Sequence, residues 1–121
     1  MDTEKILKTA ALALDDKKAI DLNAIKIADL TILCEYFLIA TATSTTHVHA
    51  LADEVEYKLE EQGVKVHHIE GRSTGWIALD YGSVIVHVFT REQREFYGLD
   101  KMWADGETVD INELINVSEG D

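Results

Sequence analysis

Residues 36–40, Tyr-Phe-Leu-Ile-Ala, form an apolar run that has no polar position on either face of a strand. Strands that helices cover have this composition, whereas strands with one solvated face alternate apolar and polar residues. The run therefore predicts a central strand of an α/β fold. A helical pattern over residues 3–17 precedes it, and a second one over residues 44–62 follows it.

Both helical patterns place their apolar residues on one face. The stripe of the first helix, which we expect to face the sheet, consists of Ile6, Leu7, Ala10, Ala11 and Leu14. The stripe of the second consists of Val48, Leu51, Ala52, Val55 and Leu59. Ser44, Thr45 and Thr46 supply N-cap side chains for the second helix, and Gly63 ends it.

Four more segments have the pattern of strands, namely residues 19–28, 64–70, 75–81 and 83–90. In the first of them, apolar residues recur mostly at every second position, with an irregularity expected near Ile25. Turn signals at residues 71–75 and 81–83 separate the last three, which predicts an antiparallel meander.

A capping-box pattern, Thr90 followed by Gln93, predicts a further helix that carries Phe96 and Tyr97. Together these elements predict an α/β fold with a mixed, largely five-stranded sheet and helices packed on it.

The length of 121 residues corresponds to one domain. There is no proline and no Gly/Ser-rich linker, so we assign residues 1–105 to a single α/β domain and residues 106–121 to an acidic C-terminal tail. Four apolar residues of that tail are spaced so that they could dock one short element: Val109, Ile111, Leu114 and Ile115.

Charge narrows the classes of partner. Twenty-three acidic and eleven basic residues give a net charge of −12, which repels phosphate backbones and argues against direct sequence-specific nucleic-acid binding. A basic protein partner fits better, although such an excess also serves solubility alone. No apolar run is long enough to span a membrane, and the opening residues lack the pattern of a signal peptide, so we expect a cytoplasmic protein without a membrane partner.

The sequence offers no catalytic or metal-binding constellation. His47 and His49 diverge around a helix, and His67 and His68 point to opposite faces of a strand, so neither pair chelates a metal locally. Phosphate-binding glycine loops and Asp-x-Asp pairs are also lacking. The single cysteine, Cys34, is expected to be a small buried hydrophobe. We therefore predict no enzyme, no metal and no cofactor.

An aromatic and charged cluster stands out in the second half of the chain: Trp76, Asp80, Tyr81, His87, Phe89, Arg94, Phe96, Tyr97 and Trp103. Large aromatic residues and arginine dominate the energetics of protein–protein interfaces. The same rings also complete hydrophobic cores, and their spacing favours neither interpretation. On a strand over 75–81, Trp76, Ala78 and Asp80 share one face, whereas Ile77, Leu79 and Tyr81 share the other.

In these motifs the chain resembles the ribosomal silencing factor (Iojap-like) family. The first part of the resemblance is the succession Glu35 to Thr41, Ser44 and the Ala50-Leu51-Ala52-Asp53 helix. The more specific part is Glu70-Gly71, Gly75-Trp76, Leu79-Asp80-Tyr81-Gly82, Val86-His87-Val88-Phe89, Arg94, Phe96-Tyr97, Leu99 and Trp103.

The resemblance implies a factor without enzymatic activity that binds the large ribosomal subunit through ribosomal protein number fourteen (uL14) and sterically blocks joining of the small subunit. It also implies lower translation when nutrients are scarce, a homodimer, and a fold similar to that of nucleotidyltransferases without their catalytic motif. Two departures concern Ala42, where many members have glycine, and Cys34-Glu35, where many have Thr-Asp. The first bears on loop conformation, because alanine resists positive φ, and the second keeps the negative charge.

We combine these observations into one candidate docking site. An apolar and aromatic patch of Trp76, Leu79, Asp80 and Tyr81 is expected to dock a basic ribosomal protein. The full set of candidate partner-binding residues adds His87, Arg94, Phe96 and Tyr97. Two alternatives remain open at this point: a dimeric interaction module for another basic protein, and an enzyme of the nucleotidyltransferase type.

Overall fold

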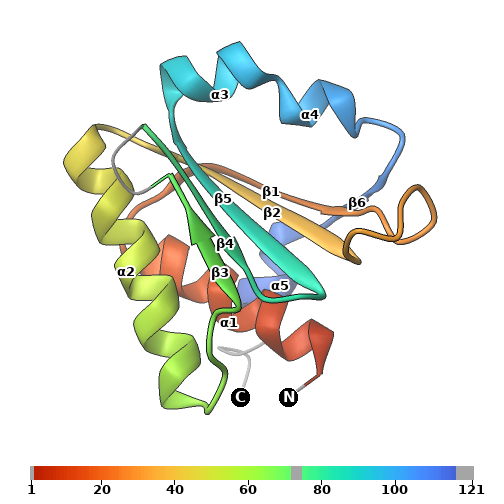
Figure 1. The fold of residues 1–121 in the computed structure, drawn as a ribbon, viewed down its shortest axis with the longest axis horizontal. Coiled ribbons are helices and arrows are strands. Elements are labelled where there is room, and N and C mark those ends of the chain that lie inside the picture. The colour runs from red at the N-terminus through yellow and green to blue at the C-terminus, as the bar shows by residue number, and fades with distance from the viewer. Residues whose placement is uncertain (1, 72–74, 117–121) are drawn as a thin grey trace.

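One mixed sheet of six strands forms the centre of the computed structural model, which describes residues 2–71 and 75–116 (Figure 1). The order across the sheet is β3-β4-β5-β2-β1-β6. The strands are β1 (Ile20–Lys26), β2 (Tyr36–Ala42), β3 (His68–Glu70), β4 (Trp76–Asp80), β5 (Val84–Thr90) and β6 (Glu107–Val109). The interior strand β2 runs parallel to β5 and antiparallel to β1, as residues 36–40 predict for a central strand.

The helices lie on both faces of this sheet (Figure 1). On one face lie α1 (Thr3–Asp16), α2 (Thr45–Glu61) and α5 (Ile111–Asn116), and on the other lie α3 (Arg91–Tyr97) and α4 (Leu99–Met102). Ser44 Oγ accepts from the His47 amide at 3.1 Å, and Thr90 Oγ1 accepts from the Gln93 amide at 3.3 Å. Both N-caps predicted from the sequence therefore form.

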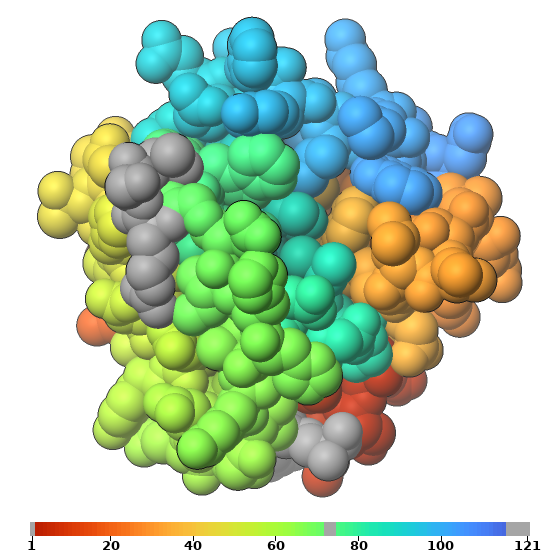
Figure 2. Space-filling model, in the orientation of Figure 1, coloured from red at the N-terminus to blue at the C-terminus, as the bar shows by residue number. Residues whose placement is uncertain are grey.

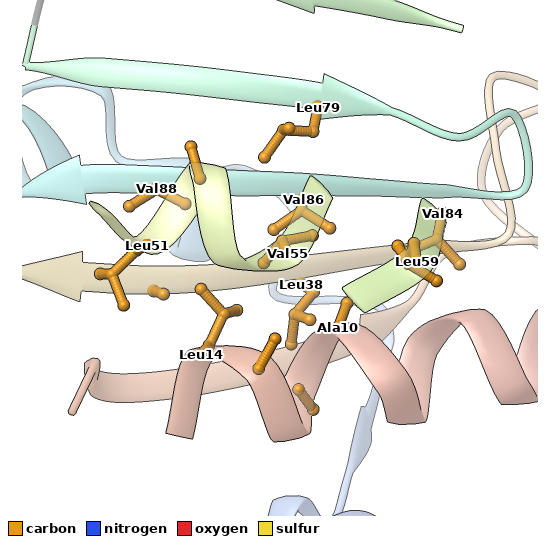
Figure 3. Packing of buried hydrophobic residues seen from close by; sticks show 14 of the residues in the cluster. Ala10, Leu14, Leu38, Leu51, Val55, Leu59, Leu79, Val84, Val86 and Val88 are labelled. Carbon is orange, nitrogen blue, oxygen red and sulfur yellow. The ribbon is translucent and has the colours of Figure 1, made fainter. Parts of the chain in front are cut away.

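The main core lies between α1, α2 and the face of the sheet that they cover (Figure 3). Leu14 of α1 and Leu51 of α2 meet Leu38 of β2 and Val86 of β5, and all four side chains are completely buried. Burying one such side chain contributes roughly 1.5–3 kcal/mol, which makes this layer the principal source of stability. The helix stripes predicted from the sequence point into this core.

The meander predicted for the second half of the chain is present. β3 pairs antiparallel with β4, and β4 pairs antiparallel with β5. The first of these strands is shorter than residues 64–70, because only His68–Glu70 pair with β4. Residues 72–74, within the predicted turn at 71–75, lie outside the described residues.

The irregularity of β1 lies earlier than expected. The register against β2 shifts between Ile20 and Asn23, and Asp21 has a positive φ of 51°. Aspartate adopts this conformation more readily than most residues, and a bulge accommodates it. The apolar residues around Ile25 therefore continue the strand without a break.

The sheet gains its sixth strand from the segment that the sequence assigns to an acidic tail. β6 pairs antiparallel with Ala24–Lys26 of β1, and α5 lies beside α1. Ile111, Leu114 and Ile115 are half-buried against the main core. The sheet therefore has six strands instead of five, and the packed structure continues past residue 105; residues 117–121 lie outside the described residues. Within the described ranges, we find no helix with the length and apolarity needed to cross a membrane.

Candidate functional site

The face of the sheet opposite α1 and α2, here called the open face, carries most of the aromatic residues. From β4 it receives Trp76, Ala78 and Asp80, which are half-buried. The strand register places Trp76 opposite Phe89 and Ala78 opposite His87 on β5. The alternation of β4 predicted from the sequence is thus confirmed, because Ile77 and Leu79 of the same strand are fully buried on the other face.

Trp76 is held in one orientation from two elements. Its ring stacks on Phe89 with a centroid distance of 5.0 Å and an interplanar angle of 22°, and the Tyr97 ring of α3 lies 4.3 Å away. The indole Nε1 donates a hydrogen bond to Nδ1 of His87 at 3.2 Å. A large ring that is fixed before binding loses little entropy when a partner covers it.

His87, which accepts this hydrogen bond, is buried on its strand of the sheet. The side chain is 6% exposed, and burial lowers its pKa to about 4, so the imidazole is neutral at pH 7. Because Nδ1 accepts from Trp76, the proton of the neutral ring resides on Nε2, which has no hydrogen-bond partner among the described residues. His87 is therefore enclosed within the sheet, and its hydrogen bond orients Trp76 at the surface.

Two further rings extend from α3 into solvent. Phe96 is 79% exposed and Tyr97 is 42% exposed, and the two rings meet edge to face at 5.1 Å. A hollow of about 370 Å³ lies between Tyr97, Trp76, Ala78 and Glu70. In Figure 2 the surface of β3 and β4 (green) lies directly beneath α3 (cyan). We call Trp76, Ala78, Asp80, Phe96 and Tyr97 the aromatic surface.

Asp80 gives the aromatic surface a negative charge at the far end of β4. Its Oδ1 accepts from the Gly82 amide at 2.7 Å, which stabilises the β4–β5 turn. In the described part of the chain, no lysine or arginine forms an ion pair with this carboxylate. The aromatic surface therefore has its rings at one end of β4 and a carboxylate at the other.

Arg94 is one of the partner-binding residues predicted from the sequence. In the structure its guanidinium forms hydrogen bonds within the chain. Its side chain is 15% exposed, and Nε and Nη2 donate to the two carboxylate oxygens of Asp100 at 3.0 and 2.9 Å. Nη1 donates to the carbonyl oxygen of Asp21 and to Thr41 Oγ1 at 2.6 and 2.9 Å. Asn23 donates to Asp100 at 2.9 Å, and the Arg94 hydrogen bonds hold the pKa of Asp100 below its usual value. We call this network the Arg94 clamp; it ties α3 and α4 to β1 and β2.

Two more of the predicted docking residues lie on the opposite face. Leu79 is completely buried in the main core beside α2 (Figure 3). Tyr81 is 4% exposed. Burial, followed by the charges of Glu56 and Glu60 on α2, raises the pKa of Tyr81. The predicted patch of Trp76, Leu79, Asp80 and Tyr81 is therefore divided by the sheet, because consecutive strand residues point to opposite faces.

Sequence reasoning missed two features of this region. The first is the Arg94 clamp. Its partners lie up to 73 residues away in the sequence, so a sequence pattern of neighbouring residues does not predict the contact. The second is the loop between β1 and β2, where the exposed fractions of Leu30, Ile32 and Leu33 are 47%, 103% and 68%. Their signal was three apolar residues outside any helix or strand pattern. Cys34 beside them is buried as expected, and burial raises its thiol pKa to about 11, which keeps it protonated.

Comparison with known proteins identifies the family and agrees with the fold. The profile of a family described as "Ribosomal silencing factor during starvation" matches residues 1–121. The Bacillus subtilis protein named ribosomal silencing factor RsfS is 37% identical over 113 residues, which are 93% of this chain and 96% of that protein. The Halalkalibacterium halodurans protein of the same name is 34% identical over 117 residues, 96% of this chain and all of that protein.

A solved structure is similar as well. The crystal structure of a Chromobacterium violaceum protein superposes with a TM-score of 0.83 and 35% identity, and the match covers 86% of this chain and 88% of that one. The full-length match to the family profile and the relatives above 30% identity settle the family. The chain belongs to the RsfS family of ribosomal silencing factors.

Proposed function

We propose that this chain binds the large ribosomal subunit in the cytoplasm through ribosomal protein number fourteen and prevents the small subunit from joining. Translation then falls when nutrients are scarce, without catalysis or a cofactor. Membership of the RsfS family supports the ribosomal target, and the aromatic surface supports a protein as the direct contact. The observation that carries the proposal is Trp76, a half-buried indole that is held in place and lies beside the exposed rings of Phe96 and Tyr97.

The chemistry of the aromatic surface matches a basic protein. Interfaces of this kind place aromatic anchors at the centre and charged pairs around them. Asp80 would pair with a lysine or arginine of the partner, because its charge has no compensating base in the described part of the chain. An ion pair between the two proteins at such an interface adds specificity as well as affinity.

The net charge of −12 supports protein docking over RNA docking. A factor that lands amid ribosomal RNA must avoid adhering to phosphate, and its acidic surfaces are repelled by the RNA backbone. The same charge attracts a basic ribosomal protein. Specific placement on the subunit then results from one attractive surface and many repulsive ones.

The test is co-sedimentation of the purified protein with isolated large and small ribosomal subunits at low and moderate salt. We compare the wild type with Trp76→Ala and Asp80→Ala, and use Tyr57→Ala on α2 as the matched control, since Tyr57 is an exposed aromatic residue on the opposite side of the sheet. Truncating an interface anchor costs about 2 kcal/mol or more, so Trp76→Ala is expected to weaken binding at least about thirtyfold.

Binding to the large subunit alone, weakened by Trp76→Ala and Asp80→Ala but not by Tyr57→Ala, supports the proposal and leads to a subunit-joining assay. Circular dichroism confirms that each variant is folded before binding is compared. Absence of binding to either subunit contradicts the proposal. Multi-angle light scattering of the free and bound protein measures whether the homodimer implied by the resemblance forms.

A further inference from the structure

The loop between β1 and β2, residues 27–35, presents apolar side chains to solvent. Ile32 is fully exposed at 103%, Leu33 is 68% exposed and Leu30 is 47% exposed. Exposed aliphatic residues are common singly, whereas three within four positions of one loop gather apolar surface of the kind found at interaction sites. Burying Ile32 and Leu33 against a partner would remove most of their surface from water.

Backbone hydrogen bonds hold this loop in a defined shape. The Ile27 amide donates to the Glu35 carbonyl at 2.8 Å and closes the base of the loop, and the Leu30 amide donates to the Ile27 carbonyl at 2.9 Å. The Glu35 amide donates to the Ser83 carbonyl at 2.8 Å, which fastens the loop to the β4–β5 turn. The apolar side chains are therefore presented by an ordered frame, so that binding costs little additional ordering.

A groove of about 450 Å³ separates the loop from the β4–β5 turn. Ile32, Leu33 and Cys34 line one side, and Gly82 and Ser83 line the other. Its margin is acidic: Glu35 lines the groove. Asp80 lies beside the groove, because its Oδ1 accepts from the Gly82 amide at 2.7 Å, and the Glu35 carboxylate accepts from the Thr3 hydroxyl of α1 at 3.2 Å. The groove thus combines an apolar wall with two negative charges.

The loop and the aromatic surface share one buried cluster beneath them. Ile27 and Cys34 at the ends of the loop belong to the same buried cluster as Phe37 and Phe89, and Trp76 packs against that cluster. In Figure 2 the loop (orange) adjoins β5 (teal) and α4 (blue) on the face that also shows β4. One partner of moderate size therefore reaches both features from the same side.

We propose that this loop and its groove form a second contact of the docking face, which receives an apolar side chain flanked by lysine or arginine on the basic ribosomal protein partner. The inference rests on the proposed function and extends it to a surface outside the aromatic residues. Charge selects this occupant: Glu35 and Asp80 attract a basic segment, whereas RNA phosphate is repelled. A second copy of the chain would bring two acidic grooves and two net charges of −12 together.

The variant that tests the loop is the double substitution Ile32→Ser/Leu33→Ser. Both side chains are exposed, so the substitutions leave the core intact and the variant is expected to fold. Tyr57→Ser on α2 is the matched control, because it exchanges an exposed aromatic residue for serine on the opposite side of the sheet. Affinity for the large subunit is measured by titrated co-sedimentation, with circular dichroism as the check on folding.

The loop variant is expected to bind the large subunit at least about tenfold more weakly than the wild type, while Tyr57→Ser binds unchanged. If the loop variant binds like the wild type while Trp76→Ala is impaired, the loop inference is overturned and the proposed function stands. If the wild type binds no subunit, both are overturned. If the variant keeps its affinity but light scattering shows that a dimer has been lost, a second copy is the occupant and the inference is wrong.

Discussion

At the scale of single residues, His87 and Trp76 show how a buried group shapes a surface. His87 is inaccessible, yet its Nδ1 determines where the indole Nε1 of Trp76 points. The arrangement requires a neutral imidazole, because a protonated ring would have no acceptor nitrogen. Burial supplies that condition by lowering the pKa of His87 to about 4.

This pKa predicts how stability depends on pH. Unfolded His87 titrates near 6.5 and the folded residue near 4, so the unfolded state takes up the proton first as the pH falls. The contribution of neutral His87 is therefore complete above about pH 6.5 and declines towards pH 4, by up to about 3 kcal/mol. Urea denaturation of the wild type and of His87→Gln between these pH values measures it.

The wild type is expected to lose more stability than His87→Gln over that range, because glutamine does not titrate. The other histidines are shared by both proteins and cancel in the difference. Parallel pH profiles of the two proteins would show that His87 titrates normally and that the account of its burial is wrong.

At the scale of elements, the Arg94 clamp decides where α3 and α4 lie. These helices are short, and no residue of either is fully buried, so hydrophobic packing alone holds them weakly. Arg94 compensates by joining Asp100 of α4 to Asp21 and Thr41 of the sheet. Phe96 and Tyr97 are thereby positioned beside Trp76 by polar contacts that lie away from the aromatic surface.

Removing the clamp is predicted to destabilise this part of the fold. Arg94→Ala leaves the partly buried Asp100 without its ion pair and is expected to cost about 2–4 kcal/mol in the free energy of unfolding. Arg94→Lys cannot form the forked contact and is expected to restore only part of this loss. Urea denaturation measures all variants.

Arg91 supplies the matched control on the same helix. It contacts Asp21 at 3.5 Å, with both side chains 61% exposed, and such surface pairs contribute about 0–1 kcal/mol. If Arg94→Ala costs no more than Arg91→Ala, the clamp does not hold α3 and the prediction fails.

At the scale of the whole molecule, negative charge is concentrated in segments outside the aromatic surface. Residues 98–121 alone contain seven acidic residues and one lysine, and α2 carries five acidic residues and one lysine. In the proposed complex, these segments would add to the long-range attraction of a basic protein, and the aromatic surface would provide the contacts that hold the complex.

The distribution predicts an association rate that depends on salt. Raising the ionic strength from about 0.05 to about 0.3 M shortens the Debye length from roughly 14 to 6 Å, so the rate constant for binding the basic partner is expected to fall several-fold. Dissociation is expected to change less, because it depends on the buried contacts. Surface plasmon resonance with purified ribosomal protein number fourteen measures both rate constants.

Asp80→Asn removes a charge from the aromatic surface, whereas Asp16→Asn removes one from the end of α1 on the opposite side of the sheet. Comparing the two separates attraction at the contact from attraction by the net charge. Asp80→Asn is expected to slow association and speed dissociation, whereas Asp16→Asn has a small effect on association alone. An association rate that is insensitive to salt would contradict electrostatic steering.

The sequence by itself determined the local elements and the faces that they bury. The apolar run over residues 36–40, the helix stripes and the caps at Ser44 and Thr90 each depend on neighbours within a few positions, so their patterns are readable in the chain. The motifs around Trp76 likewise pointed to the family before any geometry was known.

The tertiary structure decided which of the predicted site residues lie together on one surface. Leu79 and Tyr81 lie in the core, and Arg94 forms the Arg94 clamp. Residues 107–109 form the sixth strand of the sheet. These outcomes depend on partners that are distant in sequence, such as Asp21 for Arg94 and β1 for β6. Burial and hydrogen bonding between distant segments exist only in the folded chain, and no local pattern encodes them.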